Sequence, residues 1–396
     1  MTCLFIRAAR LVASLLSFSS LVLCTLVHAA PEGDINLDGK VDTVDVLQSL
    51  QVLHGNRSLD ATQYEQGDVA PLVSGWPQPD GQFNLADALL ILRAALGLLN
   101  ISYPDNQFNI GDSIGEGEAA DGSIGEAHHE TVWSTGFAAG DSVNSFNERL
   151  EAIDASGYHE NTAARDVIYN HAVSGAVMAD FATQAQAVVA STSQVPGSAA
   201  GMVDVFLGNN DVCADTLAEM TDPELFETQY RAGLDVLAAS PATRSARINV
   251  VGVPAIYWLW ESKESNWLCR LIWSAVPCQN LLAGAGDDCA SSASRNDPDT
   301  DYAGDGDNCK RRKDFHRAIR DTYNPILRDV LDEYRAAGAL QHAIYTDLYD
   351  VRFESQHVNS GDCFHPSEDG HALLAQEAWC RAPWGTADAQ CSNPGP

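Results

Sequence analysis

The chain has 396 residues, of which 54 are Asp or Glu and 23 are Lys or Arg, so its formal net charge is −31. With 45% hydrophobic residues it can form about two or three packed domains, which excludes a wholly disordered chain. The acidic excess repels phosphate backbones, and the longest basic run is Lys310–Lys313, so nucleic-acid binding is excluded as a main function.

Residues 1–29 have the features of an export signal. Arg7 and Arg10 precede the apolar stretch Leu11–Val27, and small residues follow at the spacing that signal peptidase reads. A membrane anchor is the alternative, but the serines in the stretch weaken it, and Leu23 disfavours a lipid anchor on Cys24. We expect a Sec-type signal peptide and a secreted, periplasmic or cell-surface protein. Its removal takes away two arginines and no acid, which changes the net charge to −33.

Residues 30–103 contain an internal repeat and no cysteine. Each copy combines a glycine with oxygen-bearing side chains at the spacing of a calcium loop, in which positions 1, 3, 5, 9 and 12 supply side-chain oxygens and position 7 a carbonyl. An apolar-striped helix follows each loop. A solvated acidic turn is the alternative, but it does not explain why these features recur in register. The predicted Ca2+ ligands are Asp34, Asn36, Asp38, Lys40 (through its carbonyl), Asp42 and Asp45 in the first loop, and Asp68, Asp80, Asn84 and Asp87 in the second.

This segment resembles a type I dockerin, closely in the first loop and more loosely in the second. Twelve residues separate Asp68 from Asp80, where four separate Asp34 from Asp38. The resemblance implies a small all-α domain of paired calcium loop-helix units, with structural Ca2+ and a cohesin-like module as partner. The alternative is that calcium only stabilises this part of the chain.

Residues 104–396 alternate between short β-rich runs and helical patterns. Such alternation predicts an α/β domain with a parallel sheet and helices on both faces, and its functional residues should follow the carboxyl ends of the strands. The predicted strands are Gln107–Ile110, Asp166–Val173, Met202–Leu207, Ile248–Ile256 and His342–Leu348, and the predicted helices are Asn144–Ala155, Pro223–Ala239, Lys313–Ala337 and Glu368–Cys380.

Ser113 follows the first of these strands, in the sequence Gly111-Asp-Ser-Ile-Gly115. A serine after a strand and among glycines is well placed as a nucleophile, and its own N–H can stabilise an oxyanion. A plain turn is the alternative, and a phosphate loop is excluded because no Gly-Lys-Ser/Thr follows. After the next two strands, Gly175 offers a backbone N–H and Asn210 an uncharged side-chain amide, so both are candidate oxyanion donors.

The decisive segment is Asp362-Cys-Phe-His365-Pro. An Asp and a His three residues apart on one loop can form a carboxylate-imidazole pair, in which the free ring nitrogen takes the serine proton. His371 is a competing base, but it is expected on the following helix. Together these segments predict catalysis by Ser113, Asp362 and His365, with Ser113, Gly175 and Asn210 as the oxyanion hole.

These segments resemble the SGNH branch of the GDSL lipases and esterases over nearly all of residues 107–382. Ser113, Gly175, Asn210 and the Asp362–His365 pair match the conserved blocks of that family residue by residue, although Ile114 stands where leucine is usual. The segments around Asn210 and His365 are most similar to the phospholipase B-like subgroup. The resemblance implies a three-layer αβα fold like flavodoxin and acyl-enzyme hydrolysis of carboxylic esters without a catalytic cofactor.

Eight cysteines remain after residue 29, all beyond residue 200. An even number in an exported chain favours disulfides, although eight cysteines allow 105 pairings. Zinc is the alternative, but no C-x2-C pair occurs. Residues 297–308 form an acidic loop between Cys289 and Cys309, which we interpret as a solvated loop held by a disulfide, with a further calcium site as the alternative.

The sequence therefore predicts a signal peptide (1–29), a dockerin-like calcium-binding domain (30–103) and an SGNH/GDSL hydrolase domain (104–396). The predicted function is that of a secreted lipase or esterase, including phospholipase activity. A carbohydrate acetyl esterase docked to a polysaccharide-degrading complex is one alternative. A calcium-dependent cell-surface or scaffold-binding protein is an alternative of another class.

Overall fold

The computed structural model describes residues 32–73, 76–77, 79–99, 101–153, 158–274, 278, 282, 286–387 and 391. The predicted signal peptide lies outside the described residues. Within this part of the chain, no helix combines the length and the apolar character needed to cross a bilayer.

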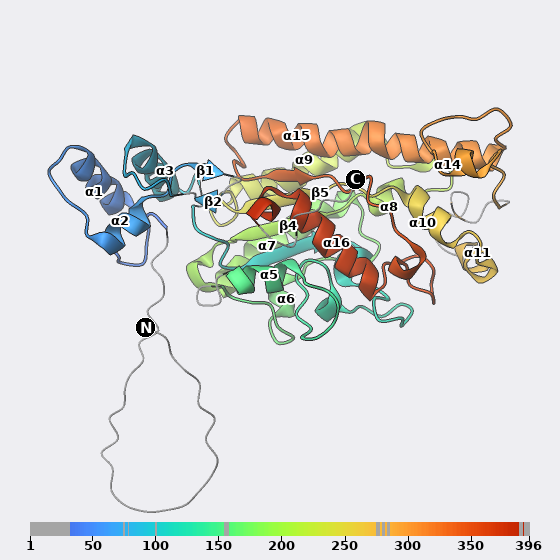
Figure 1. Cartoon of the computed structure of the whole chain (residues 1–396), viewed down its shortest axis with the longest axis horizontal. Coiled ribbons are helices and arrows are strands. Elements are labelled where there is room, and N and C mark those ends of the chain that lie inside the picture. Colours follow the sequence, from blue (N-terminus) through green and yellow to red (C-terminus); the bar gives the residue numbers. More distant parts are fainter. Residues whose placement is uncertain are drawn as a thin grey trace, which may run out of the picture.

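Two loop-helix units form the N-terminal module, which lies at one end of the molecule (Figure 1). Helix α1 (Thr43–Leu53) follows the first loop and α3 (Leu85–Ala95) the second, with α2 (Ala61–Gly67) between them. A two-stranded antiparallel pair, β1 (Leu72–Val73) and β2 (Trp76–Pro77), interrupts the second loop. The module has a small core of its own, made of Ile35, Val69, Ile91, Leu99 and Ile101.

The remainder is a three-layer αβα sandwich with a parallel sheet of four strands in the order β3-β4-β5-β6. The strands are β3 (Gln107–Gly111), β4 (Met202–Phe206), β5 (Arg247–Val251) and β6 (Ile344–Thr346). The first three are buried along their whole length, as expected for a sheet covered on both faces. The predicted fold class is thus confirmed.

Alternate residues of each strand enter different cores because successive side chains point to opposite faces of a sheet. On one face, Val203 and Val205 pack with α7 (Phe181–Ser191), α9 (Pro223–Ala239) and α15 (Asn324–Ala336). On the other face, Met202 and Phe206 belong to a second core with Phe146 and Trp379. These two aromatics come from α5 (Phe146–Ile153) and α16 (Glu368–Arg381), and Figure 1 shows α16 in front of the sheet.

One predicted strand is wrong. Asp166–Tyr169 forms the one-turn helix α6, closed by a 2.8 Å hydrogen bond from Asn170 N to Asp166 O. Asn170 makes only an isolated bridge to Asn109, although His171 and Val173 still donate backbone hydrogen bonds to β3. The segment therefore runs beside the edge strand without joining the sheet.

Other boundaries also differ from the prediction. Strand β5 ends at Val251, short of the predicted Ile256, and Pro254, which has no N–H to donate, lies in the segment before α10 (Ile256–Lys263). Strand β6 covers only Ile344–Thr346 of the predicted His342–Leu348. The single helix expected over Lys313–Ala337 is α14 (Asp307–Ala318) joined by a π-helical turn to α15, where Pro325 would break the regular ladder. Helix α5 ends at Ile153, and residues 154–155 of the predicted helix lie outside the described residues. The sequence analysis missed α7, α10, α11 (Trp267–Trp273) and the short helices α8 (Asn209–Val212) and α13 (Ser292–Arg295).

All eight cysteines after residue 200 are paired in disulfides, which excludes a zinc site on them. The pairs are Cys213–Cys278, Cys269–Cys363, Cys289–Cys309 and Cys380–Cys391.

Candidate active site

Ser113 is the first residue of the short helix α4 (Ser113–Glu116), directly after β3. Asp112 caps this helix by accepting a 3.0 Å hydrogen bond from Ile114 N, and its other carboxylate oxygen accepts from Asn209 Nδ2 at 2.9 Å. Burial raises the pKa of Asp112 to about 6, although these hydrogen bonds act in the opposite direction. The turn also needs Gly115, because a Cβ there would lie 2.7 Å from Ala172 Cβ.

The three predicted catalytic residues form one continuous chain of hydrogen bonds. Nε2 of His365 lies 3.0 Å from Oγ of Ser113, and Nδ1 lies 2.8 Å from Oδ2 of Asp362. The other oxygen of Asp362 accepts from the backbone N–H groups of Phe364 and His365, at 2.9 and 3.2 Å. The carboxylate therefore holds the imidazole so that its free nitrogen faces the serine hydroxyl.

Residues that the sequence analysis did not select hold the loop between Asp362 and His365. Asn359 accepts hydrogen bonds from Gly361 N and Asp362 N at 2.6 and 3.2 Å, and its amide donates to Ala119 O. Cys363 is bonded to Cys269, and its carbonyl accepts a 2.7 Å hydrogen bond from Nε1 of Trp273. The disulfide therefore braces the catalytic loop from α11.

The imidazole of His365 is surrounded by carboxylates. Burial lowers its pKa, but the hydrogen bond that it donates to Asp362 and the negative charges of Asp362, Glu118 and Asp112 outweigh burial, so the net shift is upward. An imidazole of this kind accepts a proton readily and is stabilised once charged.

His371, the competing base, is fully buried on α16. Burial lowers its pKa to about 3, so the ring is neutral, and neither ring nitrogen has a hydrogen-bond partner in the described part of the chain. It does not meet the serine.

Two of the three oxyanion candidates, Ser113 and Asn210, line the same pocket. Ser113 N–H is the first amide of a helix and so has no partner within the helix. Asn210 donates from Nδ2 to Ala176 O at 2.9 Å, which joins its amide to the loop carrying Gly175 and leaves the second N–H of that amide group free. Gly175 has φ of +78°, a conformation that glycine adopts without strain.

A pocket of about 90 Å³ opens beside the serine. Ser113, His365 and Asn210 form its polar wall. The rest is mostly apolar and consists of Ile114, Pro254, Ala255, Ile256, Leu259, Phe353, Val358, Phe364 and Pro366, with Asp112, Asn209 and Cys213. Such a lining suits the hydrocarbon part of an acyl group.

The predicted calcium ligands occupy two loops with the same hydrogen-bond pattern. Asp34 accepts from Asp38 N and Gly39 N, and Asp68 likewise accepts from Asp80 N and Gly81 N. At the last loop position, Asp45 accepts from Asn36 N and Asp42 N. Its equivalent Asp87 accepts from Asn84 N and from Val69 N and Ala70 N.

Asp34, Asp45, Asp68 and Asp87 are all buried. Among the described residues, none of these four carboxylates is paired with a basic side chain. The donor chemistry of the loops suits a divalent cation, since buried carboxylates without a counter-charge are costly. Among the described residues, however, no three of the loop carboxylates have oxygens within 4.8 Å of one another. Burial and the neighbouring carboxylates of Asp45 and Asp38 raise the pKa of Asp34, as expected for a carboxylate that has no positive charge beside it.

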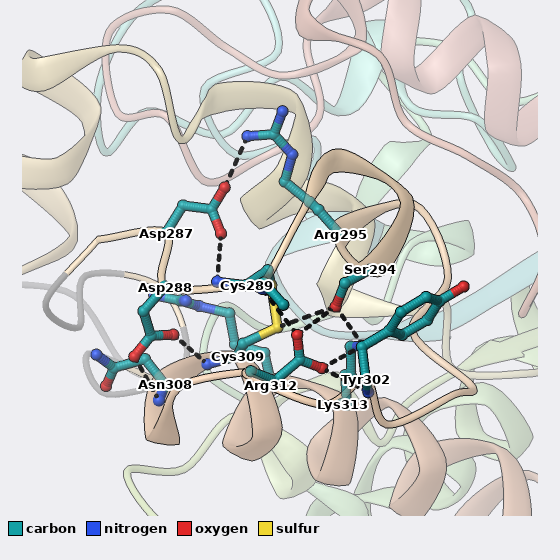
Figure 2. The surroundings of a disulfide bond; sticks show 12 residues. Asp287, Asp288, Cys289, Ser294, Arg295, Tyr302, Asn308, Cys309, Arg312 and Lys313 are labelled. Carbon is teal, nitrogen blue, oxygen red and sulfur yellow. Dashed lines mark hydrogen bonds and ion pairs between the residues drawn. A yellow bond between two sulfur atoms is a disulfide. The ribbon is translucent and has the colours of Figure 1, made fainter.

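The acidic loop at 297–308 is held by a disulfide, as predicted. Figure 2 shows the surroundings of the Cys289–Cys309 bond, with Ser294 and Lys313 beside it. Asp305 accepts a hydrogen bond from Nζ of Lys313 at 2.9 Å. Among the described residues, Cys289, Asp305 and Cys309 are the one trio of potential metal ligands within 4.8 Å. The two sulfurs are bonded to each other and the carboxylate is neutralised by Lys313, so this trio is not a metal site.

The chain matches the model of a known protein family. Residues 108–378 match the family model described as GDSL-like Lipase/Acylhydrolase. No curated protein matches the chain.

Proposed function

Because the chain belongs to the GDSL-like lipase/acylhydrolase family, we propose that it is a secreted serine hydrolase of lipid-type carboxylic esters, within the phospholipase B-like subgroup. The observation that carries this proposal is the hydrogen-bonded chain from Ser113 through His365 to Asp362. The base is within hydrogen-bond distance of both the nucleophile and the orienting carboxylate.

In the first step, Oγ of Ser113 attacks the ester carbonyl carbon while its proton moves to Nε2 of His365. The new C–O bond makes a tetrahedral oxyanion, which the N–H groups of Ser113, Gly175 and Asn210 stabilise. Collapse of this intermediate breaks the bond to the alcohol, and His365 returns the proton to the departing oxygen. The acyl group remains on Ser113.

In the second step, water takes the place of the alcohol. The oxygen of the water attacks the acyl carbon while His365 accepts a proton from this water. His365 then gives the proton to Oγ of Ser113 as the bond between Ser113 and the acyl carbon breaks and the acid leaves. Asp362 stays ionised throughout and stabilises the imidazolium. No metal takes part in either step.

The apolar pocket beside Ser113 supports an acyl chain as the favoured acid half of the substrate. Acetylated polysaccharides are the second candidate class, favoured by the dockerin-like module, because such modules accompany carbohydrate-active enzymes. Initial rates on phosphatidylcholine, tributyrin and acetylated xylan would separate the two. Faster turnover of the acetylated xylan than of both lipids would overturn the lipid assignment.

Substitution of the nucleophile tests the mechanism. We expect Ser113→Ala to lower kcat/KM for p-nitrophenyl butyrate by at least about 10⁴-fold, since the acyl-enzyme cannot form. A fluorophosphonate should label the wild-type protein at Ser113 and leave the variant unlabelled, while circular dichroism is unchanged. Full residual activity in a folded variant would contradict the proposal.

Export and calcium binding are part of the same proposal. Four disulfides in the hydrolase domain are typical of oxidising compartments, and residues 1–29 have the pattern of a signal peptide. The four buried, unpaired carboxylates of the N-terminal module support structural Ca2+ in both loops.

A binding function for the N-terminal module is the second candidate. Apolar side chains on the outer faces of α1 and α3, such as Leu47 and Leu89, are more than half exposed. Such rows favour a docking role, with a cohesin-like module as the partner. Pull-down by an immobilised cohesin, with calcium or with EDTA, tests it, and absence of calcium-dependent capture would oppose it.

A further inference from the structure

A second carboxylate faces the catalytic imidazole from the side opposite Asp362. Oε2 of Glu118 lies 3.7 Å from Nε2 of His365, the nitrogen that also meets Ser113. Glu118 is fixed in place because its backbone N–H donates to Ser113 O at 2.9 Å and its carboxylate accepts from Oγ of Ser174. The side chain is 21% exposed, so it is reachable from solvent.

Glu116 strengthens the negative charge at this position. Its Oε2 accepts a 2.8 Å hydrogen bond from Ser174 N, so both glutamates hold the segment that precedes Gly175. In the described part of the chain, no Lys or Arg forms an ion pair with either carboxylate. Their charge is thus available to a bound substrate.

The two sides of the catalytic serine therefore differ in chemistry. The apolar pocket contains Ser113 and His365 but neither glutamate nor Ser174. The departing alcohol oxygen must come within hydrogen-bond reach of Nε2 to receive its proton. The first carbon atoms of the alcohol then pass close to Glu118, while the acyl chain occupies the apolar pocket.

Starting from the ester hydrolase function proposed above, we propose that Glu118 determines specificity for the alcohol half of the ester and favours alcohols that carry a positive charge, such as choline. An ammonium group two carbons from the ester oxygen lies within a few ångströms of the Glu118 carboxylate. At that distance, in a partly exposed site, the attraction corresponds to about a tenfold gain in kcat/KM. An anionic alcohol half is repelled by the same charge.

The test compares two esters of nearly identical shape. Butyrylcholine and 3,3-dimethylbutyl butyrate share the acyl group and differ in the charge of one atom, since nitrogen replaces carbon. We expect the wild-type protein to prefer the choline ester by about tenfold in kcat/KM, and added salt to reduce this preference. Glu118→Gln should bring the ratio of the two kcat/KM values close to one, mainly because kcat/KM for the choline ester falls.

Three variants separate charge from positioning. Glu118→Gln keeps an acceptor for Ser174 and removes the charge. Ser174→Ala removes the hydrogen bond and keeps the charge, so it should preserve the preference even if both rates fall. Glu126→Gln, an exposed glutamate in the same segment, is the matched control and should leave the ratio unchanged.

The experiment distinguishes failure of the proposed role of Glu118 from failure of the proposed hydrolase function. If p-nitrophenyl butyrate is not cleaved, the proposed function fails. If it is cleaved but the wild-type protein shows no preference for the choline ester, the role of Glu118 is overturned. Equal losses for both esters in Glu118→Gln would also overturn it, because Glu118 would then act only through the pKa of His365.

Discussion

The N-terminal module and the hydrolase domain bury aspartates in opposite ways. Among the described residues, Asp34 and Asp45 of the module accept hydrogen bonds only from backbone N–H groups, as do Asp68 and Asp87 in the second loop. In the hydrolase domain, buried Asp305 meets the ammonium of Lys313, and Asp204 meets the amides of Gln107 and Asn249. These two carboxylates of the hydrolase domain therefore have side-chain partners within the domain, whereas we propose that a calcium ion balances the buried carboxylates of the module.

The same chemical change, Asp to Asn, should have different consequences in the two regions. In the hydrolase domain it alters catalysis or a buried hydrogen-bond network. In the module it removes a ligand charge. Asp-to-Asn substitutions in the two regions therefore test the contrast.

The largest effect is expected at Asp362. In Asp362→Asn, Oδ1 can still accept from Phe364 N, but an amide N–H group would face Nδ1 of His365. The ring would then carry its proton on Nε2 and could not accept the proton of Ser113, so kcat should fall about 10⁴-fold. Steady-state hydrolysis of p-nitrophenyl butyrate measures this loss.

Calcium stabilisation of the module should be unchanged in Asp362→Asn. Hydrogen exchange of residues 32–99, measured with and without calcium, provides that control. A variant that retained more than a tenth of the wild-type kcat would show that Asp362 does not set the tautomer of His365.

The second effect concerns Asp45, which is buried at the last position of the first loop. In the wild-type full chain, calcium at about 1,000 times its Kd should stabilise the module by about 4 kcal/mol. Asp45→Asn should remove most of this stabilisation, because the cation loses a charged ligand. Esterase activity should stay within twofold of the wild-type value, with or without EDTA.

Hydrogen exchange of the module in calcium titrations measures this effect. Asp60→Asn is the matched control, since Asp60 caps α2 outside both loops and Asn is an equally good cap. Exchange in the wild-type module that does not respond to calcium would contradict the calcium assignment.

The meeting of Ser113, His365 and Asp362 was predictable because the signals that mark these residues are local. Ser113 stands directly after a strand, and Asp362 and His365 are three residues apart on one loop. The two repeated loops, for which we propose calcium binding, likewise carry their pattern within short stretches of sequence. Such features do not depend on how distant parts of the chain meet.

The role of Glu118 was not predictable in this way. It depends on contacts with Ser174, 56 residues away, and with His365 across the active site. The disulfide partners were also beyond the sequence, since Cys269 and Cys363 are 94 residues apart. The predicted strand over Asp166–Val173 was wrong although the residues between Asp166 and Asn170 have high β-propensity. The backbone hydrogen bond from Asn170 to Asp166 closes a turn of helix, and the side chain of Asn170 is hydrogen-bonded to Gly115 O.

The smallest effect is expected at Asp204, in the centre of the sheet. Burial raises its pKa from 3.8 to about 7, although Gln107 and Asn249 donate hydrogen bonds to it. A carboxyl group whose pKa is raised on folding contributes stability that is fully present below its unfolded pKa and is lost as pH rises through its folded pKa. The free energy of unfolding should therefore decrease by roughly 3 kcal/mol between about pH 4 and pH 8 through this group.

Asp204→Asn should remove the part of the pH dependence of the unfolding free energy that comes from Asp204, because an amide does not titrate. A rotation of the Gln107 amide would present its unpartnered Oε1 to the new N–H group, so the variant can keep its hydrogen bonds. Urea unfolding at pH 5 and pH 8 measures the difference, with Asp329→Asn, an exposed site, as control. Asp112 and Asp105 also have pKa values raised to about 6 by burial, so part of the wild-type slope should persist. An unchanged slope in Asp204→Asn would mean that Asp204 is ionised in the folded protein, and that its two amide partners satisfy the charge as completely as Lys313 satisfies that of Asp305.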